Sequence, residues 1–192
     1  MQPETQPETR FHATFKRMDE STAEEWVRME AQDDGLVGAL PDRILDLLRL
    51  LQSDEGGFAV DRLTHSLQTA CRAELDGRDD AYVVCALVHD IGDTLTPLNH
   101  ADLGAAIVKP WVPEPYHWMV QHHDVFQGYY FWHHIGLDRN ARDAVKSHEH
   151  YEVGKEFVDK YDMLAFDPDY LTPPLAHYEP LLRAFFVEPP RG

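Results

Sequence analysis

The chain has 192 residues, and its 43% hydrophobic and 11% aromatic content is typical of one soluble globular domain with a substantial core. Its formal net charge of −17 argues against nucleic-acid binding, because phosphate polyanions would be repelled. No apolar stretch is long enough to span a membrane, and the N-terminus lacks the apolar segment of a signal peptide, so we expect a cytoplasmic protein with no membrane partner.

Residues 1–10 contain the sequence Gln-Pro-Glu-Thr twice, and we expect a disordered tail there. The remaining residues, 11–192, are predicted to form a single domain. Ser21 and Glu24 resemble the two ends of a capping box, which predicts a first helix that ends near Ala31.

Helical periodicity continues almost to the C-terminus, and no strand pattern of any length is present. We expect helices over residues 41–51, 59–75, 79–92, 99–109, 113–127, 138–147, 151–164 and 178–187. The fold class is therefore all-α. Cys71 and Cys85 lie in apolar helical patterns, so we expect buried thiols and no disulfide.

The most informative motif is His89-Asp90, which directly follows the apolar run of residues 83–88, with Asp93 three residues further on. Burying a histidine and an aspartate is costly unless their polar atoms find partners. A metal ion would satisfy both side chains, because neutral imidazole and carboxylate are metal ligands. The motif thus predicts further ligands elsewhere in the chain.

Two histidines flank this motif in sequence, and each has a structural alternative. His65 lies beside the apolar face of the preceding helix, where a histidine alone is more often a core or boundary residue. Two neighbouring antiparallel helices could nevertheless place it opposite His89. His100 follows Asn99 at a predicted helix start, where it could equally be an exposed residue of the helix end.

Three further candidates lie in the second half of the chain. His122 and His123 point about 100° apart on a helix, so one can face a site while the other packs or faces solvent. Asp162 lies among apolar residues, where it could bind metal or equally pair with a helix N-terminus or an arginine. The aromatic stretch at residues 129–132 is more typical of core packing or a pocket wall.

Taken together, these residues resemble the HD-domain superfamily, an all-helical metal-binding fold whose two-metal version supplies ligands in this order. The matching ligands are His65, His89, Asp90, His100, His123 and Asp162. Residues 65–70 and 89–92 are similar to the mixed-valent diiron oxygenases of the 2-amino-1-hydroxyethylphosphonate type. Residues 120–123 and 161–163 resemble myo-inositol oxygenase more distantly. The resemblance implies one HD-type helical bundle with a two-metal site in its core, which spans about residues 56–166.

The resemblance also implies a role for each ligand, with Asp90 bridging the two metal ions. The implied ligands of one metal are His65, His89 and Asp162, and those of the other are His100 and His123. His123 fits the family's phase, and His122 is the alternative.

The chain departs from the phosphonate oxygenases at two places. Glu55 and Phe58 stand where those enzymes carry a tyrosine and a glutamate that help to gate the site. Asp93 stands where they place a histidine near the phosphonate, and a carboxylate would repel that group. Asp93 therefore indicates a neutral or cationic substrate, or it is a catalytic proton acceptor. The structural alternative is that Asp93 orients a metal ligand.

By resemblance, we expect an oxygenase that uses two iron ions, Fe2+ and Fe3+, and dioxygen to cleave a small hydroxylated substrate. The candidate substrate contacts are Asp93, Gln127, Tyr129 and Tyr130. Aromatic rings among them could hold a quaternary ammonium group.

Two alternatives remain open. One is a phosphohydrolase with two Mn2+ or Mg2+ ions. No basic cluster adjoins His89-Asp90, which argues against phosphoester binding, although Lys109 and Lys146 could approach. The other alternative is a non-catalytic metal-dependent scaffold or sensor. The sequence leaves the oligomeric state open.

Overall fold

The computed structural model describes residues 10–32 and 38–187, so the predicted tail lies outside the described residues except at Arg10. The chain divides into two compact units, residues 1–40 and 41–192, which are described separately. Every regular element in the described ranges is a helix, in agreement with the all-α prediction. No described helix combines the length and apolarity needed to cross a membrane. The single domain over residues 11–192 stays a prediction.

In the first unit, a 3₁₀ turn, η1 (Met18–Glu20), precedes helix α1 (Ala23–Glu30). The side chain of Thr22 accepts a hydrogen bond from the Glu25 N–H, and the Glu25 carboxylate accepts one from the Thr22 N–H. The predicted capping box at Ser21 is therefore wrong by one residue. The Ser21 hydroxyl is engaged elsewhere, because it donates to the Met18 carbonyl.

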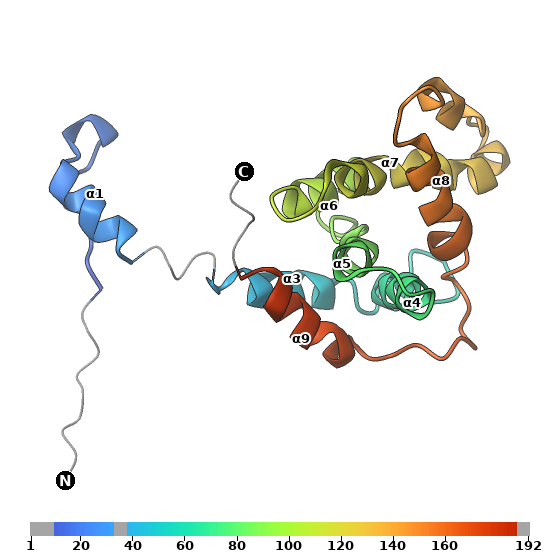
Figure 1. The fold of residues 1–192 in the computed structure, drawn as a ribbon, viewed down its shortest axis with the longest axis horizontal. Coiled ribbons are helices and arrows are strands. Elements are labelled where there is room, and N and C mark those ends of the chain that lie inside the picture. Colours follow the sequence, from blue (N-terminus) through green and yellow to red (C-terminus); the bar gives the residue numbers. More distant parts are fainter. Residues whose placement is uncertain (1–9, 33–37, 188–192) are drawn as a thin grey trace, which may run out of the picture. The chain divides into compact units, whose positions relative to one another are not determined.

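The helices from α3 onward are arranged around one central member (Figure 1). They are α3 (Leu40–Leu50), α4 (Arg62–Leu75), α5 (Asp80–Val88), α6 (His100–Val108), α7 (Glu114–Phe131), α8 (Tyr151–Phe157) and α9 (Leu175–Phe185). The short turns between them are η2 (Trp132–Ile135), η3 (Ala141–Val145) and the π-helical turn η4 (Val158–Asp162). The central helix is α5, which packs against α4, α7 and α9.

Helix α5 is central because it is apolar on every side, and all its residues from Tyr82 to Val88 are buried. Asp79 caps its first turn by accepting a hydrogen bond from the Tyr82 N–H. The chain that leaves α5 therefore emerges in the middle of the unit, and this places His89 and Asp90 in the interior. Cys71 and Cys85 are buried free thiols, as predicted.

Several helix ends differ from the prediction for local reasons. Helix α4 begins at Arg62, because Asp61 caps it through the Thr64 N–H. Helix α5 ends at Val88, so His89 and Asp90 lie on the turns that follow it. The predicted helix over 138–147 is only the η3 turn. Asp138 starts a tight turn by accepting the Asn140 N–H.

Two glycines let the segment after α5 pack tightly against α6. A Cβ on Gly104 would lie 2.7 Å from the carbonyl oxygen of His89, and a Cβ on Gly92 would lie 2.8 Å from that of His100. Both distances are shorter than any real Cβ contact, so the two backbones touch only because side chains are absent. This interlock fixes the relative positions of His89 and His100.

The predicted helix over 151–164 is α8 followed by η4. In η4 the Met163 N–H reaches back to the Val158 carbonyl, which is a π-helical hydrogen bond. Asp162 lies in this widened turn and is fully buried. The turn therefore presents a carboxylate to the interior from a part of the chain remote from α4 and α5.

Candidate metal centre

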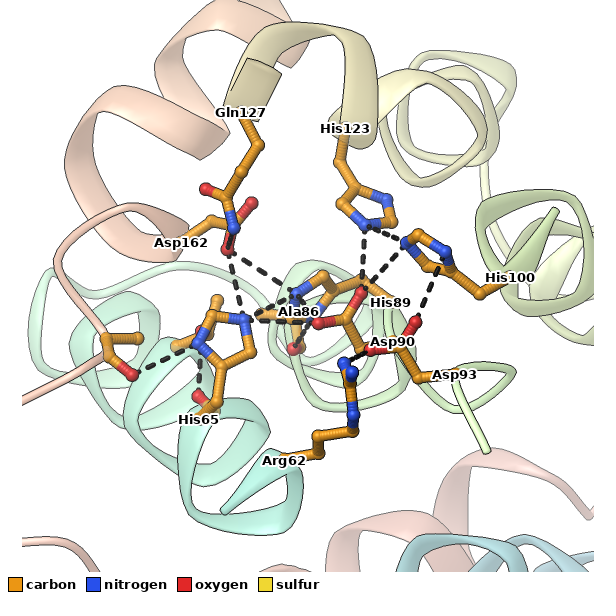
Figure 2. Close-up of polar contacts among 12 residues, drawn as sticks. Arg62, His65, Ala86, His89, Asp90, Asp93, His100, His123, Gln127 and Asp162 are labelled. Carbon is orange, nitrogen blue, oxygen red and sulfur yellow. Dashed lines mark hydrogen bonds and ion pairs between the residues drawn. The ribbon is translucent and has the colours of Figure 1, made fainter. Parts of the chain in front are cut away.

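The six predicted ligands converge on one point of the second unit (Figure 2). His65 comes from α4, His89 and Asp90 from the turns after α5, His100 from the start of α6, His123 from α7 and Asp162 from η4. All are buried except His100, which is partly exposed. They group naturally into two halves around Asp90.

The first half consists of His65, His89, Asp162 and atom Oδ2 of Asp90. The Nε2 atom of His65 lies 3.1 Å from Asp162 Oδ1 and 3.1 Å from His89 Nε2. Asp90 Oδ2 lies 3.3 Å from His65 Nε2 and 3.4 Å from His89 Nε2. Two imidazoles and two carboxylate oxygens thus face a common point.

The second half consists of His100, His123 and atom Oδ1 of Asp90. That oxygen lies 3.0 Å from His123 Nε2 and 3.3 Å from His100 Nε2, and the two Nε2 atoms are 3.2 Å apart. The two oxygens of Asp90 therefore face different groups of imidazoles, which is the arrangement that a bridging carboxylate requires.

The spacing of these atoms fits metal ions. Neighbouring ligands at 2.0–2.1 Å from an octahedral ion lie about 3 Å apart, close to the separations within each half. In addition, Asp162 Oδ2 is buried without a hydrogen-bond donor. Buried polar atoms of this kind need a partner, and a cation between the ligands would provide one.

The backbone orients three of the imidazoles. Their Nδ1 atoms lie 3.0 Å from the Ala165 carbonyl for His65, 2.8 Å from the Ala86 carbonyl for His89 and 2.7 Å from the Val120 carbonyl for His123. A neutral imidazole that donates Nδ1–H to a carbonyl presents its Nε2 lone pair on the other side. The Nε2 atoms of His65 and His89 are 3.1 Å apart, so their lone pairs repel each other unless a proton or a metal ion lies between them.

The electrostatics of the cluster without metal agree with this geometry. Burial opposes the charged form of His65, but hydrogen bonds to Asp162 and Asp90 outweigh it and raise the pKa of His65 to about 9. The pKa of His89 is raised well above its usual value, because the charge of Asp90 and the hydrogen bond to Asp162 outweigh burial. The pKa of the Asp162 carboxyl is lowered, because the same contacts outweigh its own burial.

Asp93, the predicted proton acceptor, lies beside the second half. Its Oδ1 is 3.2 Å from His100 Nδ1, and its Oδ2 accepts a hydrogen bond from Arg62 Nη1. The sequence prediction passed over Arg62, although it lies three residues before His65 and thus on the same face of a helix, which is the signal that could have identified it.

A cavity of about 290 Å³ adjoins the cluster. Its polar lining residues are Arg62, His65, Asp90, Asp93, His100, His123, Asp124 and Gln127, and its apolar ones are Phe58, Val60, Phe131, Trp132 and Phe166. His89 and Asp162 are absent from the lining, so the cavity opens mainly beside the second half. Lys109 and Lys146 do not line it, and neither does Glu55.

Of the predicted substrate contacts on α7, the structure brings only Gln127 to the cavity. Its amide Nε2 donates to Asp162 Oδ1 at 3.0 Å. Successive helical residues turn by about 100°, so Tyr129 points away from the side that Gln127 and Phe131 share. The guanidinium groups of Arg139 and Arg142 lie over the Tyr129 ring, and Tyr130 donates its hydroxyl hydrogen to Asp159.

The alternative ligand His122 is directed elsewhere. Its ring stacks on Trp118 with a centroid separation of 4.2 Å, and its Nδ1 lies 2.9 Å from the Trp118 carbonyl. The structure thus brings His123 and not His122 to the cluster, as the phase of the sequence motif suggested.

Residues 62–173 match the HD domain family. The matched region covers more than half of the chain and contains all six candidate ligands. No curated protein matches the chain.

Proposed function

Because the chain belongs to the HD-domain family, whose members are generally metal-dependent enzymes, we propose that it is a dinuclear oxygenase. It would use two iron ions and dioxygen to cleave a small hydroxylated substrate. The observation that carries the proposal is Asp90, whose two carboxylate oxygens face different groups of imidazoles. A centre with one ion would leave His100 and the buried His123 beside a carboxylate without a function.

The donor set supports iron. The predicted ligands are four imidazoles and two carboxylates, and the carboxylate of Asp93 lies beside His100. Such mixed nitrogen and oxygen ligands, without a thiolate, suit iron. When bound, iron would supply redox chemistry with dioxygen and a Lewis acid for a substrate hydroxyl. The protein side chains would hold the substrate beside His100 and His123, where the cavity is open.

The walls of the cavity support a small neutral or cationic substrate. Aromatic rings from Phe58, Phe131, Trp132 and Phe166 form much of the lining. The faces of such rings attract cations, and the carboxylate of Asp124 adds negative charge at the same cavity. A volume of about 290 Å³ limits the substrate to a small molecule.

A second candidate function, phosphoester hydrolysis with Mn2+ or Mg2+, is favoured by one observation. Arg62 lines the cavity, and a guanidinium group is well suited to binding phosphate. This arginine already pairs with Asp93 and lies 3.4 Å from Asp54, however, so two carboxylates offset its charge. We therefore place hydrolysis second.

The proposed function is tested by purifying the protein in air and without air, measuring its metal content and recording low-temperature electron paramagnetic resonance spectra. We expect about two irons per chain and a coupled mixed-valent signal. Small hydroxy compounds that carry an ammonium group should stimulate oxygen consumption. Magnesium or manganese occupancy together with phosphoesterase turnover would overturn the oxygenase and favour the second candidate.

Substitution of the bridging residue tests the dinuclear centre directly. Asp90→Ala should lose both ions, because each half loses a carboxylate oxygen, and metal analysis measures the loss. Asp102→Asn is the matched control, since Asp102 is exposed on α6 and its carboxylate bonds Gln121 instead of the cluster. Retention of two ions by Asp90→Ala would contradict the bridging role.

A further inference from the structure

The Nδ1 environment of His100 differs from that of the other three candidate histidine ligands. The Nδ1 atoms of those three face backbone carbonyls alone. His100 Nδ1 lies 3.3 Å from the Pro97 carbonyl but also 3.2 Å from Asp93 Oδ1. A carboxylate partner makes an imidazole a stronger electron donor than a carbonyl partner does.

Asp93 is itself held in place. Its side chain is 8% exposed, and a carboxylate at that burial is costly without a cation beside it. Arg62 provides that cation through Nη1 (Figure 2). Arg62 is also fixed from its other side, because its Nε lies 3.4 Å from Asp54 Oδ2 and its backbone N–H donates to the Asp54 carbonyl.

The two halves of the cluster differ in their number of carboxylates, and this difference explains what the contact between Asp93 and His100 contributes. The first half has Asp162 in addition to the shared Asp90, whereas the second half has only the shared carboxylate. Asp93 adds a negative charge to the second half at one imidazole's distance from the ion position. Both Asp93 oxygens are engaged, which favours an orienting role over the proton-acceptor role that the sequence suggested.

We propose that Asp93, clamped by Arg62, is a positioning residue that strengthens metal binding in the second half through His100. Asp93 fixes the tautomer and orientation of the His100 ring, and it makes the Nε2 lone pair of His100 a stronger electron-pair donor to the metal. The pair thereby sets the affinity of the second ion separately from that of the first. This inference rests on the proposed dinuclear centre.

Stepwise binding of Fe2+ to metal-free protein, measured by anaerobic equilibrium dialysis, tests the inference. We expect wild-type protein to bind two ions, and Asp93→Asn to bind one of them about 10- to 100-fold more weakly with the other unchanged. Arg62→Gln should weaken the same ion, and Arg62→Lys should largely restore it because the positive charge is kept. Each iron-loaded protein is then partly oxidised, and its electron paramagnetic resonance spectrum is recorded. We expect the g-values of Asp93→Asn to differ from those of the wild-type protein.

Asp46→Asn is the matched control, because it breaks an exposed aspartate–arginine pair on α3 that lies outside the cluster. Circular dichroism and thermal melting establish that each variant is folded. If Asp93→Asn does not fold, the comparison of Arg62→Gln with Arg62→Lys decides the question.

Three outcomes would count against these proposals, and they differ from one another. Unchanged affinity for both ions in Asp93→Asn and Arg62→Gln would overturn the positioning role alone. Equal weakening of both ions, without rescue by Arg62→Lys, would also overturn it, because that pattern indicates a purely structural pair. Fewer than two ions in the wild-type protein would instead overturn the proposed dinuclear function.

Discussion

At the scale of a single residue, His65 shows how strongly the metal-free cluster changes the pKa of an imidazole. Its pKa is raised to about 9 against the opposing effect of burial, because Asp162 and Asp90 stabilise the charged imidazole. Asp90 and Asp162 raise the pKa of His89 as well. In metal-free protein, protons therefore occupy positions that a metal ion would take.

Metal binding must displace these protons, which gives a prediction about pH. The apparent metal affinity should rise with pH at least up to about 9, the pKa of His65. Near neutral pH, binding should release on the order of two to three protons, because the pKa values of His65, His89 and His100 are all raised. Calorimetric titrations in buffers with different ionisation enthalpies measure this number. An affinity that is flat across this range, with no proton release, would contradict the prediction.

The raised pKa of His65 affects the stability of metal-free protein in the opposite direction, because stability falls as pH rises whereas metal affinity increases. The folded-state pKa of His65 is higher than its ordinary value of 6.5, so its contribution to stability is fully present below pH 6.5 and is lost as pH rises through about 9. Metal-free protein is thus stabilised in the range where metal binds least well.

The sequence identified the ligands more readily than the residues around them. His89 and Asp90 could be predicted because a polar pair at the end of an apolar run needs a partner. Arg62 could not be predicted as a partner of Asp93, because the contact depends on how the loop before α4 folds toward the turns after α5. Tyr129 is predicted at the substrate as part of an aromatic wall, but α7 continues to Phe131, and the turn of that helix directs Tyr129 away from the cavity.

At the scale of elements, the contact between α6 and the turn after α5 makes a prediction about Gly104. Gly104→Ala would place a Cβ 2.7 Å from the His89 carbonyl oxygen. Overpacking of this kind costs roughly 1–3 kcal/mol, which should exceed the helix-propensity gain of about 1 kcal/mol. We expect lower thermal stability and weaker metal binding, measured by melting and metal analysis.

Gly38→Ala is the matched control for this change, since a Cβ at Gly38 would meet nothing within 4 Å. It should leave metal binding unchanged. Equal stability and full metal content in Gly104→Ala would show that the two backbones can separate without moving His89.

Element types were predictable from periodicity, but two local devices were not. The π-helical turn η4 places Asp162 in the interior, yet its hydrogen bond from Met163 to Val158 has no signature in residue spacing. The helix expected over 138–147 is a turn, because Asp138 bonds the chain two residues on instead of capping a long helix.

At the scale of the whole molecule, the centre joins α4, α6, α7 and η4 around the end of α5. Removing metal should therefore destabilise the entire second unit. An ion present at about 1,000 times its Kd adds about 4 kcal/mol, and each kcal/mol shifts Tm by roughly 2–4 °C in a chain of this size.

We expect a chelator to lower Tm by roughly 10 °C for each ion removed, by the same relations. Differential scanning calorimetry with and without chelator measures the shift. Asp90→Ala protein is the control, because its Tm should not respond to chelator. The same Tm for wild-type protein in both conditions would indicate that metal does not support the fold.

The two halves of the centre also differ in how far apart their parts lie along the chain. His123 and Asp90 in the second half are 33 positions apart, whereas His65 and the Ala165 carbonyl that orients it are 100 positions apart. Closing the longer loop costs about 1 kcal/mol more in chain entropy. During folding, the second half is therefore the part of the centre that the chain can close first, before the C-terminal third of the chain has packed against α4.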